Sequence, residues 1–162
     1  EIAPKLMDNP SDYDTAANFM WSCNMALNGL IQKGVPTDWS IHAIGHEITA
    51  AYNVDHARTL AIVLPSLYRF KFEQKQAKLA QYGRRVLSLE GTDFDVAQEA
   101  IDRTEAFFHS LGIETKLSAY TSDTTDFPER AAAKLESYGA TRLGEHKDIT
   151  PREVVAILNA TL

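Results

Sequence analysis

Three of the five histidines in this chain of 162 residues fall close together, at His42, His46 and His56. A spacing of four residues places His42 and His46 on one face of a helix, because an α-helix completes a turn every 3.6 residues. His56 follows at the expected first turn of the next helix, which a short connection can bring back toward the first. Histidine is a common ligand of zinc and iron, and its neutral imidazole binds a metal without adding charge. The pattern fits a metal site, but it also fits solvent-facing histidines or hydrogen-bonded core histidines.

The segment from the second histidine onward begins like the helix of a zinc protease. It runs His46-Glu47-Ile48-Thr49-Ala50, and such a helix needs its second histidine four residues after the first. Ala50 occupies that position, so the sequence excludes this class of protease. Gly45 costs about 1 kcal/mol in a helix interior. Either another group packs closely against Gly45, or the glycine is simply tolerated.

The other candidates for chemistry are weaker. Cys23 lies in a helix that we expect to be buried, where a free thiol behaves as a small apolar side chain. We expect His109 to be a surface residue and His146 to be a loop residue. The sequence contains no glycine-rich phosphate loop and no Gly-x-Ser-x-Gly nucleophile motif.

One central segment concentrates basic residues against a single acid, Glu73. The basic residues are Arg69, Lys71, Lys75, Lys78, Arg84 and Arg85. We expect a solvated helix surface, because no aromatic side chains alternate with these charges to stack on bases. The net charge of the chain is −6, so it has no general attraction to nucleic acid or to anionic membranes.

Length and cysteine content favour one domain in a reducing compartment. Cys23 is the only cysteine, which excludes an internal disulfide, and we expect a cytoplasmic location. The N-terminus has neither the basic segment nor the apolar core of a signal peptide. Residues 15–32 are uncharged, but amide side chains interrupt them. We therefore expect a buried helix of a soluble domain there, and no membrane span.

Helical periodicity dominates the first third of the chain. A first helix is expected over residues 12–31, closing at Gly34. A second begins behind Asp38 as its N-cap and is interrupted at Asn53. The apolar side of this second helix consists of Ile41, Ile44 and Ile48.

A third, long helix is expected to follow Asp55 as its cap. Pro65 should kink or break it, because proline lacks a backbone donor and clashes with the preceding turn. The continuation over residues 67–89 is amphipathic. Its apolar positions are Leu79, Tyr82, Val86 and Leu89.

The last third of the chain is also expected to be helical. A helix with Ala97, Ile101 and Phe108 on its apolar face ends at Gly112. Residues 126–129 and 150–153 have the pattern of capping boxes, which predicts two further helices, the first stopping at Gly139. Residues 113–117 alternate like a strand but are solitary. The sequence therefore predicts one all-α domain of six or seven helices.

Residues 39–47, followed by residues 55–65, resemble the iron-containing alcohol dehydrogenase family. The signature of that family is a histidine, a second four residues on and a third fourteen after the first, in an apolar helical context. This chain has that spacing at His42, His46 and His56. The similarity extends over essentially the whole chain. It is greatest to the butanol dehydrogenase and NADPH-dependent aldehyde reductase branch.

The resemblance implies a helical metal-binding domain over residues 1–162, with the dehydroquinate-synthase-like fold of the family's C-terminal domain. The first and third motif histidines, here His42 and His56, would bind the divalent metal, iron or zinc. The middle one, His46, would be a catalytic residue lining the cleft near nicotinamide and substrate. The metal would polarise the oxygen of an alcohol or aldehyde for hydride transfer with NAD(P). Two ligands of one ion at about 2.1 Å should lie within about 5 Å of each other.

The resemblance also implies parts that lie outside this chain. Family members bind NAD(P)H mainly through an N-terminal dinucleotide-binding domain, and they take two more metal ligands from a helix upstream of Glu1. Those ligands are an aspartate and a histidine four residues later, and no histidine precedes His42 here. We therefore expect a C-terminal domain of a larger enzyme, commonly a homodimer, which alone holds metal poorly and is inactive.

Two alternatives stay open. The chain could be a stand-alone helical binding module that kept the fold and lost the chemistry, or a non-redox relative such as a dehydroquinate-synthase-like lyase. The coding sequence upstream of Glu1 separates the enzyme from the module, and a hydride-transfer assay separates the dehydrogenase from the lyase.

Overall fold

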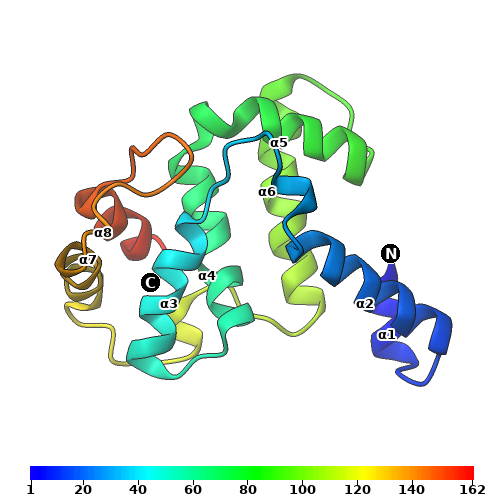
Figure 1. The fold of residues 1–162 in the computed structure, drawn as a ribbon, viewed down its shortest axis with the longest axis horizontal. Helices are drawn as coiled ribbons and strands as arrows, with labels where there is room; N and C mark the ends of the chain where they lie inside the picture. The colour runs from blue at the N-terminus through cyan, green and yellow to red at the C-terminus, as the bar shows by residue number, and fades with distance from the viewer. The chain divides into compact units, whose positions relative to one another are not determined.

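The computed structural model describes residues 1–162, and its regular structure is entirely helical. Eight α-helices and two 3-10 helices are present, and a single isolated bridge joins Leu143 to Ile149. The all-α prediction is therefore confirmed, although six or seven helices were expected. The chain divides into two compact units, Glu1–Thr37 and Asp38–Leu162 (Figure 1).

The first unit consists of α1 (Ile2–Asp8), α2 (Tyr13–Leu27) and the 3-10 helix η1 (Leu30–Gln32). Asp12 caps α2 by accepting a hydrogen bond from the backbone N–H of Asp14 at 3.2 Å. The helix ends four residues before the predicted end at residue 31. Gly29, at φ +87°, ends the α-helical stretch and forms the N-cap of η1.

The predicted burial of the uncharged helix is wrong. No residue of α2 is buried, Trp21 is 66% exposed, and Cys23 is exposed rather than a core residue. The physical reason is that α2 packs chiefly against α1 and η1, which are too short to cover it. No helix of the chain has the length and apolarity needed to cross a membrane.

In the second unit, α3 (Ser40–Tyr52) packs against α4 (His56–Phe70). Asn53 ends α3 in the left-handed conformation at φ 54°, which an asparagine tolerates. Asp38 accepts a hydrogen bond from the N–H of Ser40 at 2.8 Å. The N-cap is Trp39 and not Asp38 as predicted, but the Asp38 side chain, one residue earlier, still satisfies the first N–H of the helix.

The main core of the second unit joins α3 and α4 to the two last helices. α7 (Phe127–Ser137) and α8 (Pro151–Asn159) pack against each other and contribute to this core. Its largest fully buried side chains are Phe127, Ile44, Ile48, Ile62, Leu67, Leu117, Leu135, Ile149, Ile157 and Leu158. Ile44 and Ile48 are buried as predicted, and Ile41 is half-buried against the same core.

Pro65 does not break its helix. α4 continues through this residue to Phe70, and the interruption falls at Lys71. Pro65 is itself buried and its neighbours Ile62, Val63 and Leu67 pack into the core, so packing offsets the missing hydrogen bond. The predicted continuation over residues 67–89 is the separate helix α5 (Phe72–Leu87).

A second, smaller core lies between α5 and α6 (Asp93–Ser110) and includes Leu79, Ala80, Val96, Ala97 and Ile101. A Cβ on Gly83 would stand 2.7 Å from Val96 Cγ1 and 3.1 Å from the Val96 carbonyl oxygen. Because the helices approach closely at Gly83, the face of α5 that is buried against α6 consists of Leu79, Ala80 and Gly83. Val86, predicted as part of the apolar stripe, is consequently 64% exposed.

Of the two predicted capping boxes, only the second forms. Thr150 N–H donates to Glu153 Oε2 at 2.9 Å, and the two side chains are also hydrogen-bonded. Asp126 adopts the left-handed conformation at φ 56°, so its side chain makes no capping bond to α7. Residues 113–117 form no strand.

Candidate metal centre

The structure brings the three motif histidines together on two adjacent helices. His42 lies in the first turn of α3, His46 one turn later, and His56 opens α4. The ring centroids of His42 and His56 are 5.2 Å apart, close to the separation expected for two ligands of one ion. His46 and His56 are stacked, with centroids 4.4 Å apart. His42 and His56 are partly buried, whereas His46 is exposed.

A close contact between the helices sets this proximity. A Cβ on Gly45 would stand 2.9 Å from Thr59 Oγ1, so only glycine fits between the helices here without displacement. Thr59 is fully buried, and its hydroxyl donates a hydrogen bond to the backbone carbonyl of His56 at 2.8 Å. The glycine that the sequence left unexplained therefore allows α3 to approach the first turn of α4.

The nitrogen atoms of this cluster suit metal coordination. His56 Nδ1 is buried and has no hydrogen-bond partner, which is unusual because buried polar atoms are normally satisfied. Burial, followed by the neighbouring His56 and His46, lowers the pKa of His42. The lowered pKa favours the neutral imidazole of His42, which is the form that binds a metal. The donors present therefore fit a divalent ion such as iron or zinc.

Trp39 is a neighbour of this cluster that the sequence analysis did not assign a role. Its ring meets His42 edge-on, with centroids 4.8 Å apart and an interplanar angle of 65°. The indole is 43% exposed despite its size. The sequence could have indicated this contact, because Trp39 stands three residues before His42, about one helical turn away.

The chain does not contain a complete set of metal ligands. No group of three or more His, Cys, Asp or Glu side chains is arranged to hold a metal ion. A surface pocket is lined by residues 69–74 and Glu153, and none of the three histidines lines it. The structure thus offers a pair of partly buried imidazoles at the surface of a helical unit.

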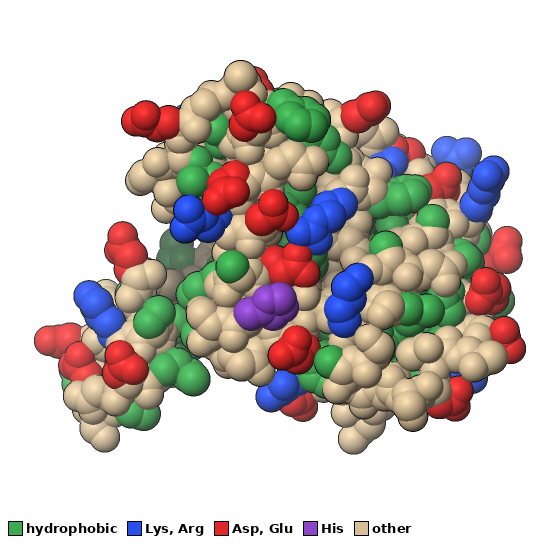
Figure 2. Space-filling model, turned by 180° about the vertical axis from the view of Figure 1, so that it is seen from behind, with side chains coloured by type: hydrophobic (Ala, Val, Ile, Leu, Met, Phe, Trp, Pro, Cys, Tyr) green, Lys and Arg blue, Asp and Glu red, His purple; other side chains and the backbone are tan.

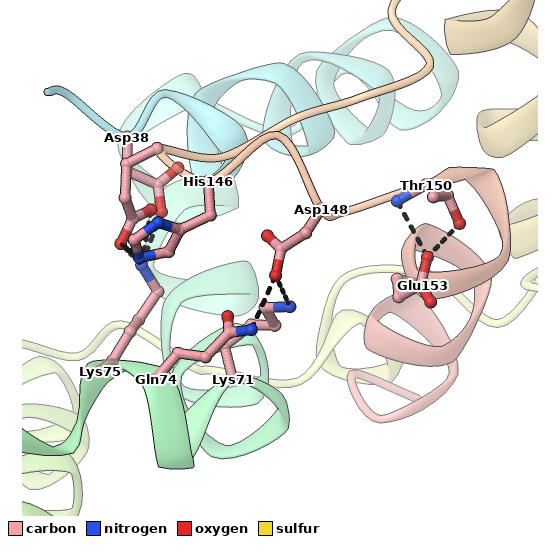
Figure 3. A network of polar contacts seen from close by, with 9 residues as sticks. Asp38, Lys71, Gln74, Lys75, His146, Asp148, Thr150 and Glu153 are labelled. Carbon is pink, nitrogen blue, oxygen red and sulfur yellow. Dashed lines mark hydrogen bonds and ion pairs between the residues drawn. The ribbon is translucent and has the colours of Figure 1, made fainter.

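An ion cluster lies beside the start of α3. Lys75 on α5 donates to Asp38 Oδ2 at 2.7 Å and to Glu145 Oε1 at 2.8 Å (Figure 3). Lys71, between α4 and α5, and Gln74, in the first turn of α5, both donate to Asp148, at 2.6 and 2.8 Å. The segment between α7 and α8 is thus attached to α5 at two points.

Charge pairing perturbs the acids of this cluster. Burial alone would raise the pKa of Asp38, but its bonds with the Lys75 ammonium and with the N–H and hydroxyl of Ser40 outweigh burial and hold the pKa below its ordinary value of 3.8. Burial likewise opposes the charge of Lys75, yet its bonds to Asp38 and Glu145 raise the pKa of Lys75. Both groups are therefore charged at neutral pH.

The predicted solvated basic face is therefore only partly correct. Lys71 and Lys75 are each 11% exposed and paired, and two arginines of the same stretch also have acidic partners. The reason is that acids distant in sequence fold back against them. Figure 2 shows acidic and basic side chains interspersed over one face of the molecule. His109 is exposed, as predicted, and His146 lies in a turn outside the helices, in agreement with its prediction as a loop residue.

Known proteins similar to this chain cover its full length. The family described as Fe-containing alcohol dehydrogenase, C-terminal, matches residues 1–162. The NADPH-dependent aldehyde reductase YqhD of Escherichia coli is 49% identical over 151 residues, covering 93% of this chain and 39% of that protein. The NADP-dependent alcohol dehydrogenase 3 of Entamoeba histolytica is 35% identical over 158 residues, covering 98% of this chain and 39% of that protein.

The fold agrees with these similarities. A crystal structure of E. coli YqhD superposes with a TM-score of 0.95 at 46% identity, covering 99% of this chain and 41% of that one. The chain thus spans about two fifths of the length of the relatives that it matches.

Proposed function

The chain belongs to the Fe-containing alcohol dehydrogenase family, whose C-terminal part it matches, and we propose that it forms the metal-binding half of an NAD(P)-linked alcohol dehydrogenase or aldehyde reductase. The observation that supports this proposal is the pair His42 and His56, whose ring centroids are 5.2 Å apart on adjoining helices. The relatives are named for NADPH-dependent aldehyde reduction and NADP-dependent alcohol oxidation.

The ring planes support the choice of His42 and His56 as the ligand pair. A metal lies close to the plane of each imidazole that binds it, because the nitrogen lone pair lies in that plane. The rings of His42 and His56 are inclined at 57°, so their planes intersect and can share an ion. The rings of His46 and His56 are stacked at 3°, so their planes do not meet at a nearby point. We therefore assign His42 and His56 as ligands and His46 as the cleft residue.

The chain's own residues hold the site and set its protonation. His42 and His56 would hold the iron or zinc, which would supply the Lewis acid that polarises the oxygen of an alcohol or aldehyde. Partial burial keeps His42 neutral and able to coordinate. Exposed His46, stacked on His56, is free to donate or accept a proton at the substrate side. The remaining ligands and the NAD(P)H site are assigned to an N-terminal dinucleotide-binding domain.

The experiment compares single histidine variants in the complete enzyme that contains this chain. Metal content is measured after purification, and NAD(P)H-dependent reduction of a short aldehyde is followed. His42→Ala and His56→Ala should each lose both metal and activity. His46→Ala should keep the metal and lose activity, and the surface variant His109→Ala should lose neither. Retention of full metal content by both His42→Ala and His56→Ala would refute the assignment.

A further inference from the structure

The start of α3 is anchored through one carboxylate. The first N–H groups of a helix have no partners within it, and Trp39 at the N-cap position provides no side-chain bond. Asp38 Oδ1 instead accepts from both the N–H and the hydroxyl of buried Ser40. His42 follows two residues after Ser40, so the direction of its ring depends on how this first turn is fixed.

Lys75 holds the other oxygen of the same carboxylate. Its ammonium lies 2.7 Å from Asp38 Oδ2 and 2.8 Å from Glu145 Oε1, and the lysine side chain is 11% exposed. Asp38 and Glu145 are themselves 18% and 24% exposed. Ion pairs this far removed from water are less screened than surface pairs and keep a defined geometry better. Figure 3 shows Lys75 reaching from α5 toward Asp38.

These contacts form a continuous path to the proposed ligand. Lys75 binds Asp38, Asp38 binds Ser40 in the first turn of α3, and His42 lies in that same turn. We propose that Lys75 is a positioning residue of the metal site, which fixes the start of α3 and thereby the orientation of the His42 ring. The inference rests on the proposed function, because it requires that His42 binds the metal.

Lys71, which directly precedes α5, provides a matched control. It is also 11% exposed, and it binds Asp148 at 2.6 Å, in the same segment that contains Glu145. Lys71 makes no contact with Asp38. Removing it therefore weakens the attachment at Asp148, where Gln74 still donates at 2.8 Å, and leaves the Lys75–Asp38 anchor in place.

The test measures how fast Zn²⁺ leaves the complete enzyme for a chromogenic chelator, together with the absorption spectrum of the Co²⁺-loaded enzyme. Lys75→Met should release Zn²⁺ about 10- to 100-fold faster, the usual range when a residue supporting a metal ligand is lost. Its Co²⁺ spectrum should change. Lys75→Arg, which keeps the charge, should restore part of both properties. Lys71→Met should show the same Zn²⁺ dissociation rate and the same Co²⁺ spectrum as the wild type.

Each outcome has a separate meaning. If the wild type binds no metal through His42, the proposed function fails. If it does, and Lys75→Met releases Zn²⁺ no faster than Lys71→Met, the positioning role fails. Should Lys75→Met not fold, Asp38→Asn keeps the Ser40 cap and weakens only the contact to Lys75. If Asp38→Asn releases Zn²⁺ at the same rate as the wild type, the inference is also overturned.

Discussion

Gly45→Ala should disturb the contact that holds the histidine helices together. The added Cβ would stand 2.9 Å from Thr59 Oγ1, and the neighbouring Leu60 Cδ2 would be at an ordinary 3.5 Å. Overpacking of a buried contact costs about 1–3 kcal/mol. Alanine gains about 1 kcal/mol over glycine in a helix interior. The net loss in the free energy of unfolding should therefore be about 0–2 kcal/mol, with faster release of a metal bound by His42 and His56.

Thr59→Ala isolates this clash, because it removes Oγ1 and leaves the Cβ of residue 59 at 3.5 Å. Thr59→Ala alone should cost about 1 kcal/mol for the lost hydrogen bond to the His56 carbonyl. Gly45→Ala in the Thr59→Ala background should then be stabilising by up to about 1 kcal/mol. The assay is denaturant unfolding of the metal-free complete enzyme for the four members of the cycle. Equal effects of Gly45→Ala in the two backgrounds would refute the reasoning.

Three further predictions concern stability and ionisation. Because the folded-state pKa of Asp38 is lowered, its stabilising contribution is full above the ordinary value of 3.8 and is lost as the pH falls through the folded pKa. In Asp38→Asn, the melting temperature should fall less steeply as the pH is lowered through this acid range. The same slope as in the wild type would contradict the prediction. Gly83→Ala should destabilise the α5–α6 contact by about 1–2 kcal/mol in denaturant unfolding, since the Cβ meets the Val96 backbone as well as its side chain and alanine regains about 1 kcal/mol of helix propensity. Burial and the bond to Glu47 raise the pKa of Tyr138 to about 12, and Glu47→Gln should return it toward 10 in an ultraviolet titration.

The parts of the fold that the sequence predicted depend on local interactions. The Thr150 capping box, the end of α3 at Asn53 and the spacing of Ile44 and Ile48 each involve residues within a turn or two of one another. The meeting of the histidines was also predictable, because one short connection separates α3 from α4. Their division into ligands and cleft residue came from family resemblance, and the ring angles now support it physically.

The missed features depend on contacts between distant residues. Lys75 and its partners Asp38 and Glu145 are separated by 37 and 70 positions in sequence, so nothing in the local pattern distinguished Lys75 from a solvated lysine. The exposure of α2 was missed for the same reason, because apolar spacing predicts a buried face only where another element covers it. The break at Lys71 instead of Pro65 likewise reflects burial of the proline.

The central claim is that His42 and His56 provide two ligands of one divalent metal. Anomalous X-ray diffraction from crystals of the complete enzyme, at the iron and zinc absorption edges, tests it most directly. One anomalous peak should lie about 2.1 Å from a ring nitrogen of both His42 and His56, with no bond to His46. A peak bonded to His46, or one away from His42 and His56, would contradict it.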